Sequence, residues 1–199
     1  MGAGRTKIKV DLNIAPLMLP VAHGRNPKDM VVFHETVSPD YKGFQDILGV
    51  ARYMPSRGLG IHGIIDAEGY LGWAVLMEPS VLYHTASNNG GVNTRSIGIE
   101  MISRVMLDYP DNQRRFQWWW QRKRQLEKAA QVLAYLHRTQ GIPLDYTVGN
   151  LPGVTTHWQI TQTYKVAGGH VDAWPRHAGG YFPVNRIIYR ARQLAKRGY

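Results

Sequence analysis

The chemistry of this chain must come from its histidines and from a few acidic residues near the ends of apolar segments. The sequence has eight histidines and no cysteine, which excludes disulfides, thiol nucleophiles and cysteine-based zinc sites. His34 closes the apolar segment that starts at Met30, and His157 closes a second one near Val154. Strands that end there would deliver both imidazoles to the rim of a sheet.

Two imidazoles and one carboxylate form the ligand set of an open zinc site. Asp172, in a glycine-containing loop after His157, supplies the carboxylate. Three protein ligands leave the fourth tetrahedral position to water, which is typical of a catalytic Zn2+ site. We therefore expect His34, His157 and Asp172 to hold the metal. For His34 taken alone, a hydrogen-bonded core histidine is the alternative.

The composition indicates one globular domain with an anionic partner. The chain has 199 residues, 44% of them hydrophobic, and 24 Lys and Arg against 14 Asp and Glu give a net charge of +10. A protein with this charge is attracted to nucleic acid, anionic membranes or anionic wall polymers. No apolar run approaches the roughly 20 residues of a membrane span, and we expect no cleavable signal peptide.

Strands and helices are predicted to alternate along the chain. Strands are expected at residues 30–36, 61–66, 70–76, 96–102 and 154–157, the second and third as a hairpin. Helices are expected after Ser38-Pro39-Asp40, from Asp111 to about Gly141 without a break, and from Asn185 onwards. This order predicts an α/β fold with a central mixed sheet flanked by helices. Residues 1–29 are an extension that either packs on the sheet or forms an arm, and 30–199 form the single main domain.

Six short segments add a family resemblance to this pattern. They are VVFHET, IHGIIDAEG, YHTAS, NTRSIGIE, THWQI and HVDAWP, in this order from about Met30 to Pro175. Together they resemble the zinc-dependent N-acetylmuramoyl-L-alanine amidases, whose superfamily includes the peptidoglycan recognition proteins and many phage endolysins. The resemblance implies a substrate groove over one face of the sheet, a zinc at its base, and hydrolysis of the amide between N-acetylmuramic acid and L-Ala of bacterial peptidoglycan.

The resemblance also assigns catalytic roles. The family's metal ligands fall on His34, His157 and Asp172, in agreement with the set inferred from the residues. Glu100, which ends SIGIE, corresponds to the residue that activates the attacking water, with an exposed strand-end carboxylate as the alternative. His170 stands two positions before the loop ligand, where many members carry Lys or Arg, and we expect it to stabilise the oxyanion.

The sequence departs from the family pattern around two of these motifs. Ile61 precedes His62 where many members have a tyrosine, so no tyrosine-assisted step is expected. The usual Asp-Pro-Gly after the loop ligand is replaced by Asp172-Ala173-Trp174-Pro175. Asp172 is therefore the ligand whose placement depends most on the loop.

Four further residues are candidate contacts to the substrate. His84 of YHTAS corresponds to a family histidine that lines the groove, and His62 is expected on a strand beside it. For both, packing in the core is the alternative. Asn93 and Arg95, just before SIGIE, are candidate contacts to the acidic stem peptide, with an exposed loop as the alternative.

Residues 114–124 carry the strongest competing signal. Basic residues alternate there with Phe116 and three consecutive tryptophans, a composition also found on nucleic-acid surfaces. Three adjacent helical residues span about 200°, so at least one tryptophan is expected near the surface. Trp119 and Phe116 are the candidates for packing on the sheet.

Three functions follow, in order of expectation. The first is a zinc amidase of phage-endolysin type, made in the host cytoplasm and acting on peptidoglycan and anionic wall polymers. The second is a peptidoglycan-binding module of the same fold that does not cut. The third is a basic nucleic-acid-binding protein, but it leaves the histidines and Glu100 without a role, so we expect no nucleic-acid partner.

Overall fold

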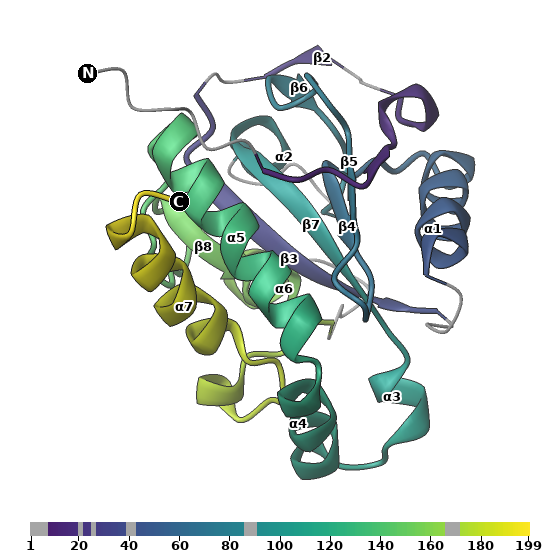
Figure 1. The fold of residues 1–199 in the computed structure, drawn as a ribbon, viewed down its shortest axis with the longest axis vertical. Coiled ribbons are helices and arrows are strands. Elements are labelled where there is room, and N and C mark those ends of the chain that lie inside the picture. The colour runs from purple at the N-terminus through teal and green to yellow at the C-terminus, as the bar shows by residue number, and fades with distance from the viewer. Residues whose placement is uncertain (1–7, 20–21, 25–26, 39–42, 86–90, 166–171) are drawn as a thin grey trace.

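A mixed β-sheet runs through the middle of the molecule (Figure 1). The computed structural model describes residues 8–19, 22–24, 27–38, 43–85, 91–165 and 172–199. In these residues the sheet has six strands, in the spatial order β1-β5-β4-β7-β3-β8. The strands are β1 (Leu12–Asn13), β3 (Met30–Val37), β4 (Gly63–Ile65), β5 (Leu71–Trp73), β7 (Ser96–Ser103) and β8 (Gly153–Thr156). A separate antiparallel pair consists of β2 (Ala22–His23) and β6 (Ser80–Val81).

The centre of the sheet is parallel, and only β4 and β5 pair antiparallel, as the predicted hairpin requires. Side chains of β3 alternate between two apolar cores: Val31 and Phe33 face one, whereas Met30 and Val32 face the other. The burial of both faces explains why this strand is an unbroken apolar run in the sequence. The predicted α/β class and mixed sheet are confirmed.

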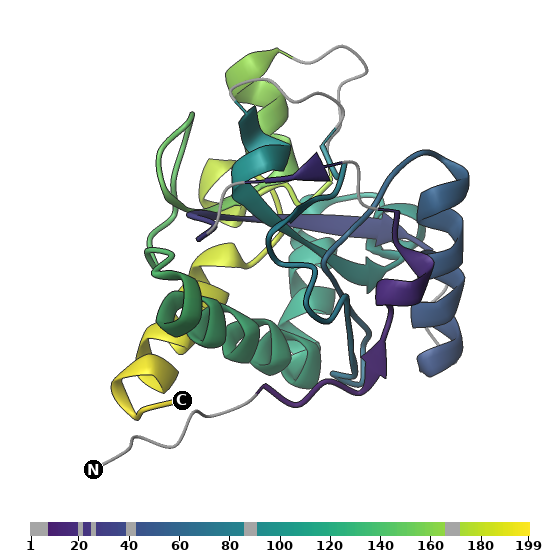
Figure 2. The same cartoon turned by 90° about the horizontal axis from the view of Figure 1, so that it is seen from above.

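Helices cover both faces of the sheet (Figure 2). The long helices α5 (Lys123–Gln140) and α7 (Val184–Lys196) lie side by side on one face. The opposite face carries α2 (Val92–Arg95) and α6 (His157–Tyr164), with α1 (Phe44–Ser56) toward the β1 edge. The remaining short elements are η1 (Ala15–Leu17), α3 (Val105–Asp108), α4 (Asn112–Gln121) and η3 (Arg176–Ala178). No helix in the described ranges has the length and apolar character needed to cross a bilayer.

Residues 11–14, in the segment before β3, pack on the six-stranded sheet. β1 adds a parallel strand beside β5, and Ile14 is fully buried in the core that α1 covers. Asp11 extends this contact by accepting a hydrogen bond from the backbone N–H of Leu71 at 2.9 Å. These residues therefore complete the sheet edge.

The helix predicted from Asp111 to Gly141 is two helices. Asp111 does cap α4, since its side chain accepts the N–H of Arg114 at 2.8 Å, but Arg122 leaves the helical conformation with ψ at +52°. The break lets α4 bury Trp119 against Phe182, with ring centroids 5.1 Å apart, while α5 turns to bury its own apolar face.

Three other boundaries differ from the sequence prediction. The helix expected after Ser38 begins at Phe44, because Gly43 has a positive φ of 56° and stops it from extending back. In the last helix Asn185 lies in the first turn and Pro183 is the N-cap. His157 does not end a strand: it is the first residue of α6.

Trp119 and its neighbour Trp120 offer a direct test of this packing. Trp119 is fully buried, whereas Trp120 is 50% exposed. Replacing a buried tryptophan by alanine costs about 3–5 kcal/mol, so Trp119→Ala is expected to lower the free energy of unfolding by that amount. Trp120→Ala is expected to cost less than about 1 kcal/mol. Urea denaturation of both variants measures this difference, and equal losses would contradict the assigned burial.

Candidate active site

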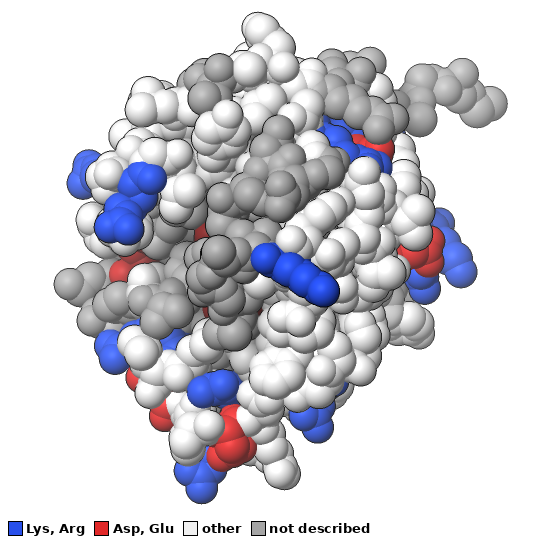
Figure 3. All heavy atoms as spheres, turned by 180° about the vertical axis from the view of Figure 1, so that it is seen from behind, with Lys and Arg blue, Asp and Glu red and all other residues white. Residues whose placement is uncertain are grey.

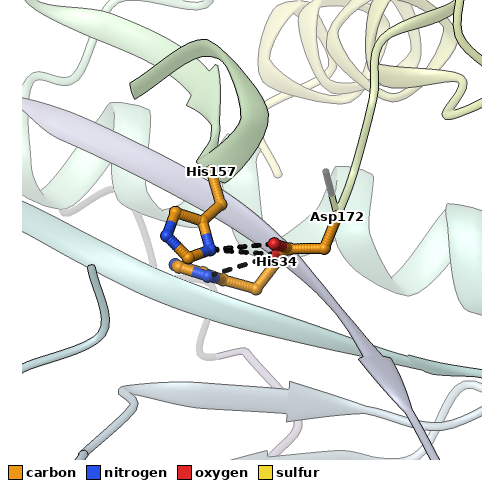
Figure 4. Close-up of side chains that lie close together, drawn as sticks. All are labelled: His34, His157 and Asp172. Carbon is orange, nitrogen blue, oxygen red and sulfur yellow. Dashed lines mark hydrogen bonds and ion pairs between the residues drawn. The ribbon is translucent and has the colours of Figure 1, made fainter. Parts of the chain in front are cut away.

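Three side chains that are far apart in the sequence meet above the sheet (Figure 4). One ligand atom from each of His34, His157 and Asp172 lies within 4.8 Å of the other two. Nδ1 of His157 is 3.0 Å from Oδ1 of Asp172, and Nδ1 of His34 is 3.7 Å from Oδ2. The structure thus brings the three expected ligands together.

The spacing of these atoms fits a tetrahedral metal ion. Ligand atoms about 2.0–2.1 Å from a tetrahedral zinc lie about 3.3–3.4 Å from one another. The observed separations of 3.0 and 3.7 Å bracket this value. Both histidines are buried, whereas Asp172 is partly exposed. Imidazole nitrogens with one carboxylate oxygen are the donor set of a catalytic zinc site.

The parallel register of three strands positions two of the ligands. His34 on β3 pairs with Glu100 on β7, and Phe33 pairs with Thr156 at the end of β8. His157 follows Thr156 directly, so it comes next to His34 at the point where β8 ends. The Thr156 hydroxyl caps α6 by accepting the N–H of Gln159 at 3.3 Å, and this Thr-x-x-Gln pattern is a sequence signal for a helix start at His157.

The loop that carries Asp172 is fixed from two sides. Its backbone carbonyl accepts the N–H of Trp158 on α6 at 3.1 Å. The next residue, Ala173, has a positive φ of 52° and is fully buried on the opposite face of the sheet. There its N–H donates to the carboxylate of Glu35. A non-glycine residue in this conformation persists only where its surroundings hold it.

Glu35 is a site-supporting residue that the sequence analysis missed. Its carboxylate accepts hydrogen bonds from the Ser103 hydroxyl and from the Tyr181 hydroxyl, the latter at 2.8 Å. Burial raises its pKa to about 7, although these two hydrogen bonds lower it. The sequence signal for Glu35 was an acidic residue inside an apolar strand, next to His34. Only the fold shows that its side chain points to the face of the sheet opposite His34.

Glu100 lies in the row of side chains that contains His34. It is 6% exposed, and its Oε2 is buried with no hydrogen-bond partner in the described part of the chain. Burial raises its pKa well above the usual range, and the nearby carboxylates of Asp172 and Glu35 raise it further. The alternative of an exposed strand-end carboxylate is therefore wrong. A buried oxygen without a partner, beside three metal-type ligands, is suited to take up and release a proton.

His84 and Asn93 lie behind the ligands. His84 is 4% exposed, and its Nδ1 is 3.0 Å from Nε2 of His34. Burial holds its pKa well below the usual range, with smaller contributions from His62, His157 and Lys28, so its ring is neutral. Asn93 accepts the N–H groups of His84 and Thr85 at 3.1 and 3.0 Å. Both residues are enclosed by protein, so they do not form the groove surface that the sequence analysis expected.

His62 occupies a packing position. It is fully buried, and Nδ1 accepts the N–H of Gly98 at 3.2 Å while Nε2 lies 3.4 Å from the carbonyl of Ser80. Burial lowers its pKa to about 3. This burial agrees with the alternative that His62 packs in the core. It does not agree with the expected contact between His62 and the substrate.

Arg95 lies at the other end of the sheet from the ligands. It precedes the first residue of β7, so about four to five residues, or roughly 13–16 Å of strand, separate it from the position of Glu100. Its guanidinium forms two hydrogen bonds of 2.6 Å to Asp29 and also contacts Asn150. This ion pair holds Arg95 in place, and its expected contact with the stem peptide stays a prediction. His170 is outside the described residues, so its expected role is untested.

The basic aromatic segment is folded onto the protein surface. Guanidinium groups cover aromatic faces: Arg122 lies 4.0 Å from the Trp118 ring centroid, and Arg186 lies 3.8 Å from that of Trp120. Since these faces are already occupied by cations, they are poor stacking platforms for bases. This arrangement weakens the nucleic-acid alternative.

Comparison with solved structures places the fold. The chain matches Staphylococcus aureus hydrolase AmiA in complex with its ligand with a TM-score of 0.59 and 16% identity, over 90% of this chain and 82% of that one. It matches the endolysin amidase LysCS from Clostridium intestinale with a TM-score of 0.55 and 19% identity, over 96% and 99%. The complex of tracheal cytotoxin with peptidoglycan recognition proteins LCa and LCx gives 0.52 and 18%, over 75% and 84%.

Comparison of sequences identifies the family. No curated protein matches the chain. A family model described as N-acetylmuramoyl-L-alanine amidase matches residues 24–177, which include all three expected ligands and Glu100. The structural neighbours, amidases and peptidoglycan recognition proteins alike, have the same fold as this chain. The chain therefore belongs to the N-acetylmuramoyl-L-alanine amidase family.

Proposed function

We propose that this protein is a zinc-dependent amidase that hydrolyses the bond between N-acetylmuramic acid and L-Ala of bacterial peptidoglycan. The observation that carries the proposal is the convergence of His34, His157 and Asp172 beside the buried carboxyl group of Glu100. Family membership supports an amide bond in peptidoglycan as the target.

The reaction divides into tasks that the chain's residues can perform. A bound zinc ion would polarise the scissile carbonyl group and make water acidic enough to attack it at neutral pH. Glu100 takes a proton from the attacking water and delivers it to the nitrogen of the departing L-Ala. Burial and the neighbouring carboxylates raise its pKa, which favours the protonated form that acts as the acid in the second half of this transfer.

His170 is the proposed donor to the developing oxyanion. This assignment derives from its position two residues before Asp172. An imidazole donates to an oxyanion from either a protonated ring or a ring with the correct tautomer. Removal of one such donor typically costs about 100- to 1000-fold in rate.

The charge of the protein supports a role at the bacterial wall. Its net charge of +10 favours wall polymers that carry phosphate or carboxylate groups. Lys and Arg side chains lie in several separate groups on the face shown in Figure 3, so the attraction acts over a broad surface. With the resemblance of the motifs to phage endolysins, this supports lysis of a host cell from within as the biological setting.

Metal removal tests the central claim. Purified peptidoglycan digested by the protein is expected to release stem peptides with a free L-Ala amine, seen by mass spectrometry. A chelator should abolish the release and added zinc should restore it. Binding to intact peptidoglycan without any release would instead favour the second candidate function, a recognition module that does not cut. This candidate stands because the superfamily also includes the peptidoglycan recognition proteins.

Glu100 can be tested separately from the metal. Glu100→Gln keeps the shape of the side chain but cannot accept the water proton, so the rate is expected to fall by about 100-fold or more. Zinc content should stay at the level of the unmodified protein. Glu68→Gln is the matched control, because Glu68 is an exposed carboxylate paired with Arg124 at 2.7 Å. Full activity in Glu100→Gln would remove this residue from the mechanism.

Salt dependence tests the electrostatic contribution. Lysis of whole walls is expected to slow as the salt concentration rises, because charges more than about 8 Å apart are screened at physiological ionic strength. Cleavage of a small soluble muropeptide, measured in parallel, should change much less. Equal rates of wall lysis at low and high salt would show that net charge plays no part.

A further inference from the structure

A chain of three hydrogen bonds runs from the proposed metal centre into the protein interior. Nε2 of His34 is 3.0 Å from Nδ1 of His84, and Nε2 of His84 is 2.9 Å from Oγ of Ser96. The Ser96 oxygen is in turn 2.6 Å from the backbone carbonyl of Val92. The three side chains are at most 4% exposed. The proposed reaction gives His84 and Ser96 no task.

The carbonyl of Val92 determines the position of each proton in this series of hydrogen bonds. A carbonyl oxygen only accepts, and two oxygens 2.6 Å apart require a proton between them, so the Ser96 hydroxyl donates to Val92. The Ser96 oxygen must then accept from His84, which places a proton on Nε2 of that ring. In the neutral ring Nδ1 of His84 is an acceptor, and it takes the Nε2–H of His34.

This order of protons leaves the other nitrogen of His34 with its lone pair. That atom, Nδ1, is the one that faces Asp172 at 3.7 Å, as Figure 4 shows. A metal ligand needs an unprotonated nitrogen, and the hydrogen bond on the far side of the ring determines which nitrogen that is.

We propose that His84 and Ser96 are positioning residues, which hold His34 in the one tautomer whose lone pair points to the metal. The proposal rests on the proposed zinc-dependent function. Without the acceptor at Ser96, the His84 proton can move to Nδ1. It would then donate to His34, whose own proton would shift to the metal-facing nitrogen and block it.

The surrounding backbone is shaped to hold His84 in this place. Asn93 accepts the N–H of His84 at 3.1 Å. A Cβ atom on Gly98 would come within 2.6 Å of Cγ of the His84 ring, so the absence of a side chain there makes room for the imidazole. Ser96, Gly98 and Glu100 alternate along β7 and share one face. In this Ser-x-Gly-x-Glu pattern the serine accepts a hydrogen bond from His84, the glycine makes room for the His84 ring, and the glutamate is the proposed base.

Zinc affinity of the folded protein tests the proposal. Ser96→Ala and His84→Leu are expected to weaken zinc binding by about 10- to 100-fold, measured by competition with a chromophoric chelator. His84→Asn, whose amide oxygen can replace Nδ1 as the acceptor, is expected to bind zinc more tightly than His84→Leu. Thr161→Val is the control, because it removes a buried hydroxyl without a hydrogen-bond partner in the described residues. It should leave the affinity unchanged.

A measurement on the unmodified protein keeps the test independent of folding. Long-range proton–nitrogen NMR spectra of the zinc-free protein at neutral pH report the tautomer of each histidine. His34 is expected to carry its proton on Nε2. A proton on Nδ1, or unchanged zinc affinity in folded Ser96→Ala and His84→Leu, would overturn the positioning role alone. If the zinc affinities and the tautomer are as expected but the protein leaves peptidoglycan intact in the digestion experiment, only the proposed function would be overturned.

Discussion

The parallel register of β8, β3 and β7 is the constraint on which the site depends. It places His34 and Glu100 next to each other within β3 and β7, and brings His157, which follows the last residue of β8, beside His34. The register is itself fixed by burial, since Val31 and Phe33 must face one core while Met30 and Val32 face the other. Packing on both faces of the sheet therefore determines which side chains meet at the site.

Charge is distributed in opposite ways inside and outside this protein. The chain carries a net charge of +10, yet three carboxyl groups lie close together inside it: Asp172 raises the pKa of both Glu35 and Glu100, and Glu35 raises that of Glu100. Such a cluster in a protein interior is costly unless protons or a cation neutralise it. The proposed metal ion would supply that cation.

The sequence alone predicted five of the strands, the fold class and the residues that converge, because apolar segments and the histidines near their ends are local signals. The two-residue strands β1, β2 and β6 were not predicted. The sequence could not supply partners that only the fold brings near. In the sequence Arg95 has no visible partner, and only the fold places Asp29 beside it. His62 and His84 are equally plausible substrate contacts in the sequence, and only the fold shows that both are buried. The break at Arg122 was equally hidden, since its residue type is compatible with a continuous helix. The helix start at His157 was also missed, although the Thr-x-x-Gln pattern is a local signal for it.

His34 and Glu35 hold the loop of Asp172 from opposite faces of one strand. His34 faces Asp172, and Glu35 accepts the N–H of Ala173 behind the sheet. Shifting β3 by one residue would exchange the two side chains between faces and break both contacts at once. A single insertion or deletion within β3 is therefore incompatible with the way the site is held. The fold itself is shared with AmiA and LysCS at only 16% and 19% identity.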